Sequence, residues 1–72
     1  MKQTVDARGL SCPQPVLLAV QAMRQLGQGE IEVLVDNEAS LENVSRAAAS
    51  QGWSVSSSET GAGDYALALT KA

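Results

Sequence analysis

The residue with the clearest chemical potential is Cys12, which lies in the stretch LSCPQP and is the only cysteine of the 72-residue chain. A cysteine thiolate can act as a nucleophile, a metal ligand or a redox group. The chain has no histidine, which disfavours a zinc site and a Cys–His catalytic dyad. Without a second cysteine to resolve a disulfide, a C-x-x-C oxidoreductase is also disfavoured. Cys12 is therefore suited to accept a group and hand it on.

The two prolines of this stretch predict that Cys12 lies at the start of a helix. Proline is favoured at the first helical position, because its missing N–H has no partner there and its fixed φ suits the helix. We therefore expect Cys12 at the N-cap, Pro13 at the first position and Pro15 at the third. Most unpaired cysteines are small buried apolar residues. However, an N-cap is half-exposed, and Ser, Asp or Asn would cap the helix better, so a chemical role is favoured.

The helix terminus alone is expected to activate this thiol only moderately. A helix N-terminus stabilises an anion by about 0.3 to 1 kcal/mol, and one pKa unit corresponds to about 1.36 kcal/mol. The pKa of a free thiol, about 8.5, would therefore fall by less than one unit. Arg8 adds positive charge nearby, whereas Asp6 and the acidic loop at residues 36–38 oppose ionisation of Cys12.

The remaining sequence predicts four strands and two helices in the order βαβαββ. Apolar residues at three- and four-residue steps indicate helices at about 13–26 and 38–50, which end at Gly27 and Gly52. Asp36 and Asn37 offer caps to the second helix. Alternating residues predict strands at 2–7, 30–35, about 53–58 and about 65–70. The first helix is expected to bury Val16, Ala19, Val20, Met23 and Leu26.

This order predicts an α/β (α+β) two-layer sandwich formed by one domain, residues 1–72. Strand–helix–strand units give parallel strands, and the last two strands are close enough for a hairpin, so the four-stranded sheet is mixed. One strand face is polar or small, so both helices should cover the other. The loops after the first three strands should then surround Cys12. Leu34, Ala66 and Ala68 could form a flat docking patch on the open face, although they fit ordinary surface residues better. The residues expected on this face are Thr4, Glu32, Ser54, Ser56, Ala66 and Ala68.

Composition limits the partners. The net charge of −3 and a pI of about 4.6 argue against direct binding of nucleic acid, and the two aromatic residues, Trp53 and Tyr65, are expected in the core rather than on an RNA-binding surface. The longest apolar run, Val16–Val20, is far too short to cross a bilayer. We therefore expect no membrane association and a cytoplasmic location, which suits an unpaired thiol.

The stretch DARGLSCPQPV, Asp6–Val16, resembles the signature of the TusA/SirA-like sulfur carriers, in which a C-P-x-P motif opens the first helix. The resemblance implies the βαβαββ sandwich shared with the C-terminal domain of a bacterial translation initiation factor. It also implies that Cys12 carries a persulfide, received from a cysteine desulfurase or rhodanese-like donor. An acceptor protein would then take the sulfur for tRNA thiolation, cofactor synthesis or sulfur oxidation.

Carried over by position, Pro13 and Pro15 set the geometry of the cysteine. Asp6, Arg8 and Gly9 belong to the same motif. Structural roles explain these residues as well as a functional role does: hydrogen bonding for Asp6, solvent exposure for Arg8 and a tight turn for Gly9. The middle of the chain looks more like the TusA-like domains of YedF-type proteins, which are associated by name with selenium metabolism. No cofactor or metal is expected. The alternative function is a non-catalytic interaction or regulatory module, for example the N-terminal domain of a larger YedF-type protein.

Overall fold

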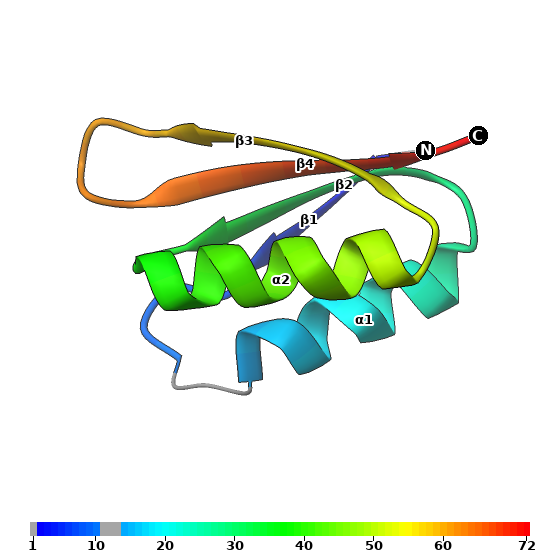
Figure 1. Cartoon of the computed structure of the whole chain (residues 1–72), viewed down its shortest axis with the longest axis horizontal. Helices are drawn as coiled ribbons and strands as arrows, with labels where there is room; N and C mark the ends of the chain where they lie inside the picture. Colours follow the sequence, from blue (N-terminus) through cyan, green and yellow to red (C-terminus); the bar gives the residue numbers. More distant parts are fainter. Residues whose placement is uncertain (1, 11–13) are drawn as a thin grey trace.

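The computed structural model describes residues 2–10 and 14–72 and has the predicted βαβαββ order (Figure 1). Each element begins and ends within about two residues of its predicted range. This agreement is expected, because glycines and capping residues mark the ends of the elements in the sequence. The elements are β1 (Lys2–Asp6), α1 (Gln14–Leu26), β2 (Gly29–Val35), α2 (Glu38–Ser50), β3 (Ser54–Glu59) and β4 (Tyr65–Lys71).

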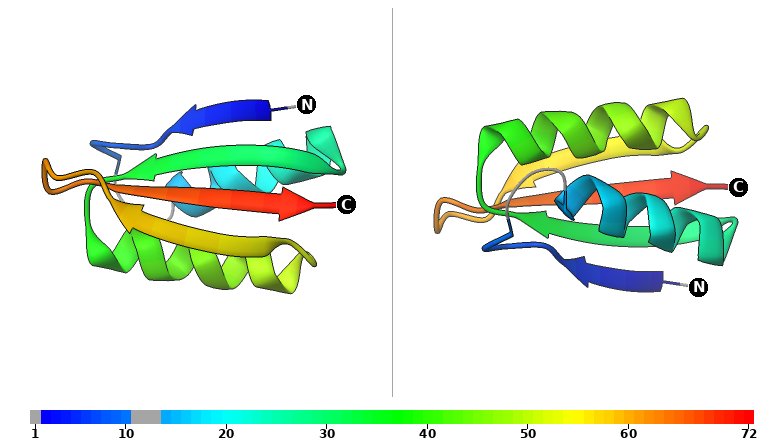
Figure 2. Two further views of the ribbon diagram at one scale, coloured as in Figure 1. Left: turned by 90° about the horizontal axis from the view of Figure 1, so that it is seen from above. Right: turned by 90° about the horizontal axis from the view of Figure 1, so that it is seen from below.

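The sheet is mixed, with the strand order β1-β2-β4-β3. β1 pairs with β2 in parallel, and β4 lies antiparallel to both β2 and β3. The first three strands therefore run in one direction, and their carboxyl ends meet at one edge of the sheet. This edge, which we call the carboxyl edge, is where the loop after β1 leads towards α1 (Figure 2).

Both helices cover one face of the sheet, and the opposite face is open (Figure 2). Strand residues that face the helices form the centre of the core: Ile31, Val33, Val35, Leu67 and Leu69 are all at most 1% exposed. The open face carries the small and polar residues of the predicted set, with Thr4, Glu32, Ala68 and Ser56 in one cross-strand row and Leu34 opposite Ala66 in the next. The two-layer sandwich predicted from the sequence is confirmed.

The start of α2 and the end of α1 follow from local chemistry. The Asn37 side chain accepts a hydrogen bond from the Ser40 backbone N–H at 2.7 Å, which satisfies one of the free donors of the first turn. Gly27 has a φ of 77°, a conformation that glycine adopts without strain, and it ends α1. Neither helix is long and apolar enough to cross a membrane, in the part of the chain that the structure describes.

The face of α1 differs from the predicted one. Ala19 and Met23 are buried as expected, but Pro15 and Ala22 are also buried, whereas Val16, Val20 and Leu26 are only half-buried. α1 contacts α2 as well as the sheet, so the buried stripe of α1 turns towards α2.

The two aromatic residues differ in burial. Trp53 is 5% exposed, but Tyr65 is half-buried, because Tyr65 starts β4 near the carboxyl edge.

Candidate functional site

The loop after β1 leaves the sheet in a fixed direction. The backbone N–H of Ala7 donates to the carbonyl oxygen of Leu34 at 2.8 Å, and Ala7 is buried, so the parallel pairing with β2 continues one residue past the strand. Arg8, Gly9 and Leu10 then lead to residues 11–13. Cys12 and Pro13 lie outside the described residues, so their places at the N-cap and first helical position stay predictions.

Pro15 lies in the first turn of α1, as predicted, and its ring is almost fully buried. A proline in this turn loses no intrahelical hydrogen bond. Because its ring belongs to the core, Pro15 also fixes the start of α1 against the rest of the domain. The chain on the carboxyl side of residues 11–13 is therefore anchored by packing.

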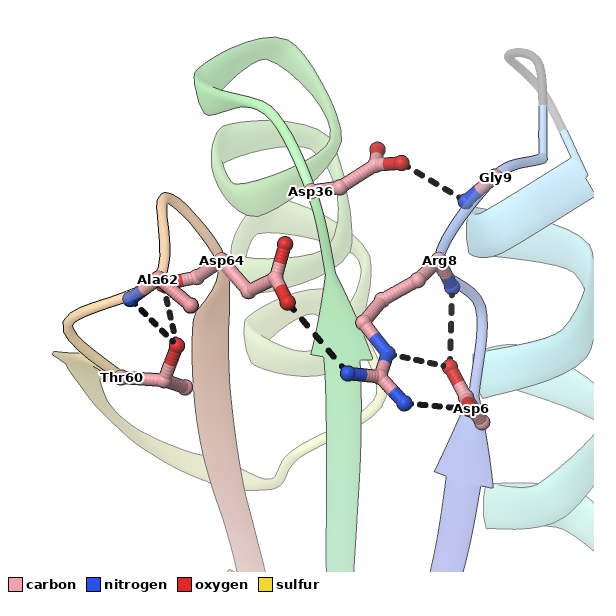
Figure 3. Close-up of polar contacts among 7 residues, drawn as sticks. All are labelled: Asp6, Arg8, Gly9, Asp36, Thr60, Ala62 and Asp64. Atoms are coloured by element: carbon pink, nitrogen blue, oxygen red, sulfur yellow. Dashed lines mark hydrogen bonds and ion pairs between the residues drawn. The ribbon is translucent and has the colours of Figure 1, made fainter.

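On the amino side, the same loop is anchored by Arg8 (Figure 3). Its guanidinium donates to both carboxylate oxygens of Asp6, each at 2.9 Å, and to Asp64 Oδ2 at 3.3 Å. The Arg8 backbone N–H also donates to Asp6 at 3.1 Å. Since Asp64 immediately precedes β4, these contacts connect the exit of β1 to the β3–β4 turn.

Asp36 anchors the next residue of the loop. Its carboxylate accepts a hydrogen bond from the Gly9 backbone N–H at 2.7 Å, and this bond, followed by one from the Asn37 side chain, holds the pKa of Asp36 below its usual range. Gly9 has a φ of 79°, and a Cβ there would meet no atom within 4 Å. The backbone conformation, rather than lack of space, therefore requires glycine at this position.

These contacts change the expected electrostatic roles around the thiol. Arg8 was predicted to favour the thiolate, but two carboxylates already pair with its guanidinium and raise its pKa further. Asp6 and Asp36 were predicted to oppose ionisation of the thiol, and hydrogen bonding was predicted as an equally good role for Asp6. Each of them accepts hydrogen bonds that shape the loop. Asp6, Asp36 and Asp64 therefore serve to fix the loop, and two of these carboxylates pair with the Arg8 guanidinium.

Asp36 and Asp64 contact residues of the motif, and these contacts were not predicted from the sequence. The two residues are 27 and 56 positions away along the chain from their partners, in two different loops. The available signal was their position directly after β2 and directly before β4, at the edge where strand ends meet. Asp64 is itself held by its turn, since its carbonyl oxygen accepts from the Thr60 N–H at 3.0 Å.

A shallow, mostly apolar pocket of about 240 Å³ lies between the end of the loop at Leu10 and the first turns of α1. It is lined by Leu10, Gln14, Leu17 and Leu18. Leu17 is 60% exposed and is the one exposed large hydrophobic residue among residues 2–10 and 14–72. This surface, formed by residues that precede and follow residues 11–13 in the sequence, therefore offers apolar contact area to another molecule.

Comparison with known proteins decides the family. The model of the family described as "Sulfurtransferase TusA" matches residues 3–71. The chain belongs to the TusA/SirA-like family. A protein of Methanocaldococcus jannaschii named "Putative sulfur carrier protein MJ0990" is 34% identical over 68 residues, which cover 93% of this chain and 91% of that protein. The crystal structure of a SirA-like protein from Desulfitobacterium hafniense is 34% identical, with a TM-score of 0.90 over 94% of this chain and 95% of the other.

The TusA/SirA-like family is one of sulfur carriers, so membership implies contact with proteins that donate and accept sulfur. It also confirms the resemblance seen in the motif Asp6–Val16 and the sandwich fold. The anchored loop described above is the part of this TusA/SirA-like domain that leads directly to its single cysteine.

We expect the Asp6–Arg8 pair to persist in acid. The hydrogen bonds from the Arg8 side chain and backbone lower the pKa of Asp6 from 3.8 to about 2. Because the pKa is lower in the folded chain, the pair contributes to stability above about pH 3.8 and loses that contribution as the pH falls through about 2. NMR titration of the Asp6 carboxyl carbon should give a midpoint near 2.

The matched variant is Arg8→Gln, in which the guanidinium is removed and a polar side chain is kept. In this variant the Asp6 midpoint should return towards 3.8. A wild-type midpoint near 4, unchanged by the substitution, would show that the pair does not hold the loop in solution.

Proposed function

We propose that this protein carries sulfur as a persulfide on Cys12 and relays it from a donor protein to an acceptor protein. The observation that carries the proposal is that the only thiol of the chain falls in the C-P-x-P motif of a TusA/SirA-like domain matched over residues 3–71. Asp6, Arg8, Gly9 and Pro15 support it by fixing the chain on both sides of residues 11–13, and we assign Pro13 to the same role.

The transfer is a thiol–persulfide exchange. The Cys12 thiolate attacks the outer sulfur of a persulfide on the donor, a new S–S bond forms on Cys12, the S–S bond of the donor breaks, and the donor leaves as a thiolate. An acceptor nucleophile then attacks the outer sulfur on Cys12, which returns to the thiolate. The electrons balance in both steps, so neither an oxidant nor a bound cofactor is required.

In this proposal, the chain presents the Cys12 thiol to its partners and does not strongly activate it. It contains no histidine that could act as a base beside the thiol, and Arg8 is occupied by Asp6 and Asp64. A thiol with a pKa near that of free cysteine, about 8.5, is a few per cent ionised at neutral pH. We infer that the partners complete the reactivity of Cys12 when they bind.

The donor in this proposal is a cysteine desulfurase or a rhodanese-like protein, in a reducing cytoplasm. The acceptor belongs to tRNA thiolation, cofactor synthesis, sulfur oxidation or, as the YedF-like middle of the sequence suggests, selenium metabolism. We propose residues 1–72 as one functional domain. Protein partners, rather than nucleic acid, fit its net charge of −3.

The direct test is sulfur loading. After incubation with a cysteine desulfurase and cysteine, the intact protein should gain the mass of one sulfur atom, and a reductant should remove it. Protein whose single thiol was first blocked with iodoacetamide should gain none. Equal gain by the blocked protein would refute the proposal.

We propose that a partner that exchanges sulfur with Cys12 also contacts the apolar pocket at the start of α1, which Leu17 lines. We expect Leu17→Asp to slow loading by the desulfurase about tenfold, which corresponds to the roughly 1.4 kcal/mol that one exposed apolar contact contributes at an interface. Because Leu17 is 60% exposed, the thermal unfolding midpoint should barely change. The initial rate of sulfur gain measures the effect.

Gln25→Asp provides the matched control, since it adds the same charge at an exposed position of the same helix, two turns away. Its loading rate should equal that of the wild type. If both variants slow loading equally, the effect is one of charge and the apolar surface has no part in docking.

A further inference from the structure

A second surface at the carboxyl edge lies between α2 and the β3–β4 hairpin. It is a groove of about 600 Å³, much larger than the pocket lined by Leu10 and Leu17. One wall is a single face of α2, formed by Glu38, Leu41, Glu42 and Ser45, and the other is formed by Ser57, Ser58, Glu59 and Tyr65. In Figure 1 the hairpin rises away from the start of α2.

Small side chains keep this groove open. Ser57 lies on the helix-facing side of β3, two residues after Val55, where a large apolar residue would close the layer. Ser45 occupies the corresponding place on α2, and its hydroxyl donates to the Leu41 carbonyl oxygen at 2.7 Å. Leu41 and Tyr65 are half-buried and pack against the core. The groove therefore has an apolar floor and hydroxyl groups along its walls.

The rim of the groove is acidic. Glu38 starts α2, and Glu59 pairs with Tyr65 across the hairpin. Partial burial, followed by the charges of these two carboxylates, raises the pKa of the Tyr65 phenol. Glu42 is paired with Arg46 at 3.1 Å, so that pair is neutral. The carboxylates are also spread out: among residues 2–10 and 14–72, no group of three His, Cys, Asp or Glu could hold a metal ion.

The negative charge continues beyond the groove, over the carboxyl edge. Five acidic residues in the loops and element ends there face only one basic residue, Arg8, which gives a local net charge of −4. The five are Asp6, Asp36, Glu38, Glu59 and Asp64. The basic residues Lys2, Arg24 and Lys71 lie at the opposite end of the molecule, at the start of β1 and the ends of α1 and β4.

From these observations we infer that the groove binds a basic segment of the protein with which Cys12 exchanges sulfur. Lysine or arginine side chains of the segment pair with Glu38 and Glu59, and its apolar side chains lie on Leu41 and Tyr65. Charge complementarity identifies the occupant, since separated carboxylates around an apolar floor match a polypeptide with spaced cationic and apolar groups. The identity of the partner as a sulfur donor or acceptor rests on the proposed function, whereas the binding chemistry does not.

The test uses a fluorescein-labelled peptide in which Lys and Leu alternate, with binding followed by fluorescence anisotropy and by NMR of the protein amides. Amide shifts should concentrate at the groove walls of α2 and β3. Glu38→Gln/Glu59→Gln should weaken binding about fivefold, as expected for two exposed charge pairs. The matched control Glu30→Gln/Glu32→Gln removes the same charge from β2, on the open face of the sheet, and should leave binding within about twofold of the wild type.

An equal loss in both double variants would overturn the inference, because it would show attraction by net charge alone. Spermidine that binds the groove as tightly as the peptide would also overturn it, because the apolar floor would then add nothing. The peptide needs no sulfur for binding, and sulfur loading is measured separately. If the wild-type groove does not bind the peptide while sulfur loading is intact, this inference alone is refuted. If the groove binds the peptide but Cys12 gains no sulfur, the proposed function alone is refuted.

Discussion

Leu67→Ala should lower the free energy of unfolding by about 2 to 5 kcal/mol. Leu67 is fully buried at the centre of β4, between Val33 of β2 and Ser57 of β3. Its side chain faces the helix layer, so truncation removes buried apolar area and leaves a cavity that the paired strands on both sides cannot close. A domain of this size has a total stability of roughly 4 to 11 kcal/mol, so one substitution would remove a large share of it.

Urea unfolding followed by Trp53 fluorescence measures this effect, because Trp53 is 5% exposed in the folded domain. Thr70→Ala is the matched control: it truncates an exposed residue of the same strand and should change stability by less than about 0.5 kcal/mol. A loss below about 1 kcal/mol for Leu67→Ala would contradict the central place of β4 in the core.

The sandwich could be predicted from the sequence because its local signals agree. Alternation of Ile31, Val33 and Val35 defines β2, and glycines end both helices near the predicted positions. The polar outward residues of the strands implied one open sheet face, which the structure confirms. These properties depend on residues close together in sequence, where periodicity is informative.

The burial of particular side chains was less predictable. Ala22 and Pro15 are buried although the apolar stripe of α1 did not include them, since contact between α1 and α2 adds a second buried direction. Tyr65 alternates like a core residue, yet it lines the groove between α2 and the hairpin. Periodicity identifies a face of an element, but the small neighbours Ser45 and Ser57 decide whether that face is covered.

The candidate site also contains some residues that could be predicted from the sequence and others that could not. The motif identified Asp6, Arg8 and Gly9, because they lie next to the cysteine in the sequence. Asp36 and Asp64, which accept hydrogen bonds from Gly9 and Arg8, come from distant loops. Only the strand order brings them to the carboxyl edge, and a single sequence contains no residue spacing that reports such contacts.

The second large effect concerns Cys12→Ser, which should abolish sulfur carriage completely. A serine hydroxyl is similar in size to a thiol but is essentially un-ionised at neutral pH and cannot form a persulfide. No other cysteine can take over, because Cys12 is the only one in the chain. Serine is also a good helix N-cap, so the variant should remain folded with a circular dichroism spectrum and unfolding midpoint close to those of the wild type.

The rival function makes the opposite prediction. If the domain acted only as an interaction module, Cys12→Ser would leave its biological function intact, and a charge placed at Leu34 on the open sheet face would abolish it. Leu34 is half-buried and lies opposite Ala66 in the row that ends at Asp6. Complementation of a strain that lacks the gene, with each variant in turn, distinguishes the two functions.

Mass spectrometry of peptides from the desulfurase-treated protein tests the central claim most directly. The account predicts that the peptide containing Cys12 gains the mass of one sulfur atom, that a reductant reverses the gain, and that Cys12→Ser shows none. An unmodified Cys12 peptide under conditions in which the desulfurase loads another carrier, or equal sulfur gain by Cys12→Ser, would contradict it.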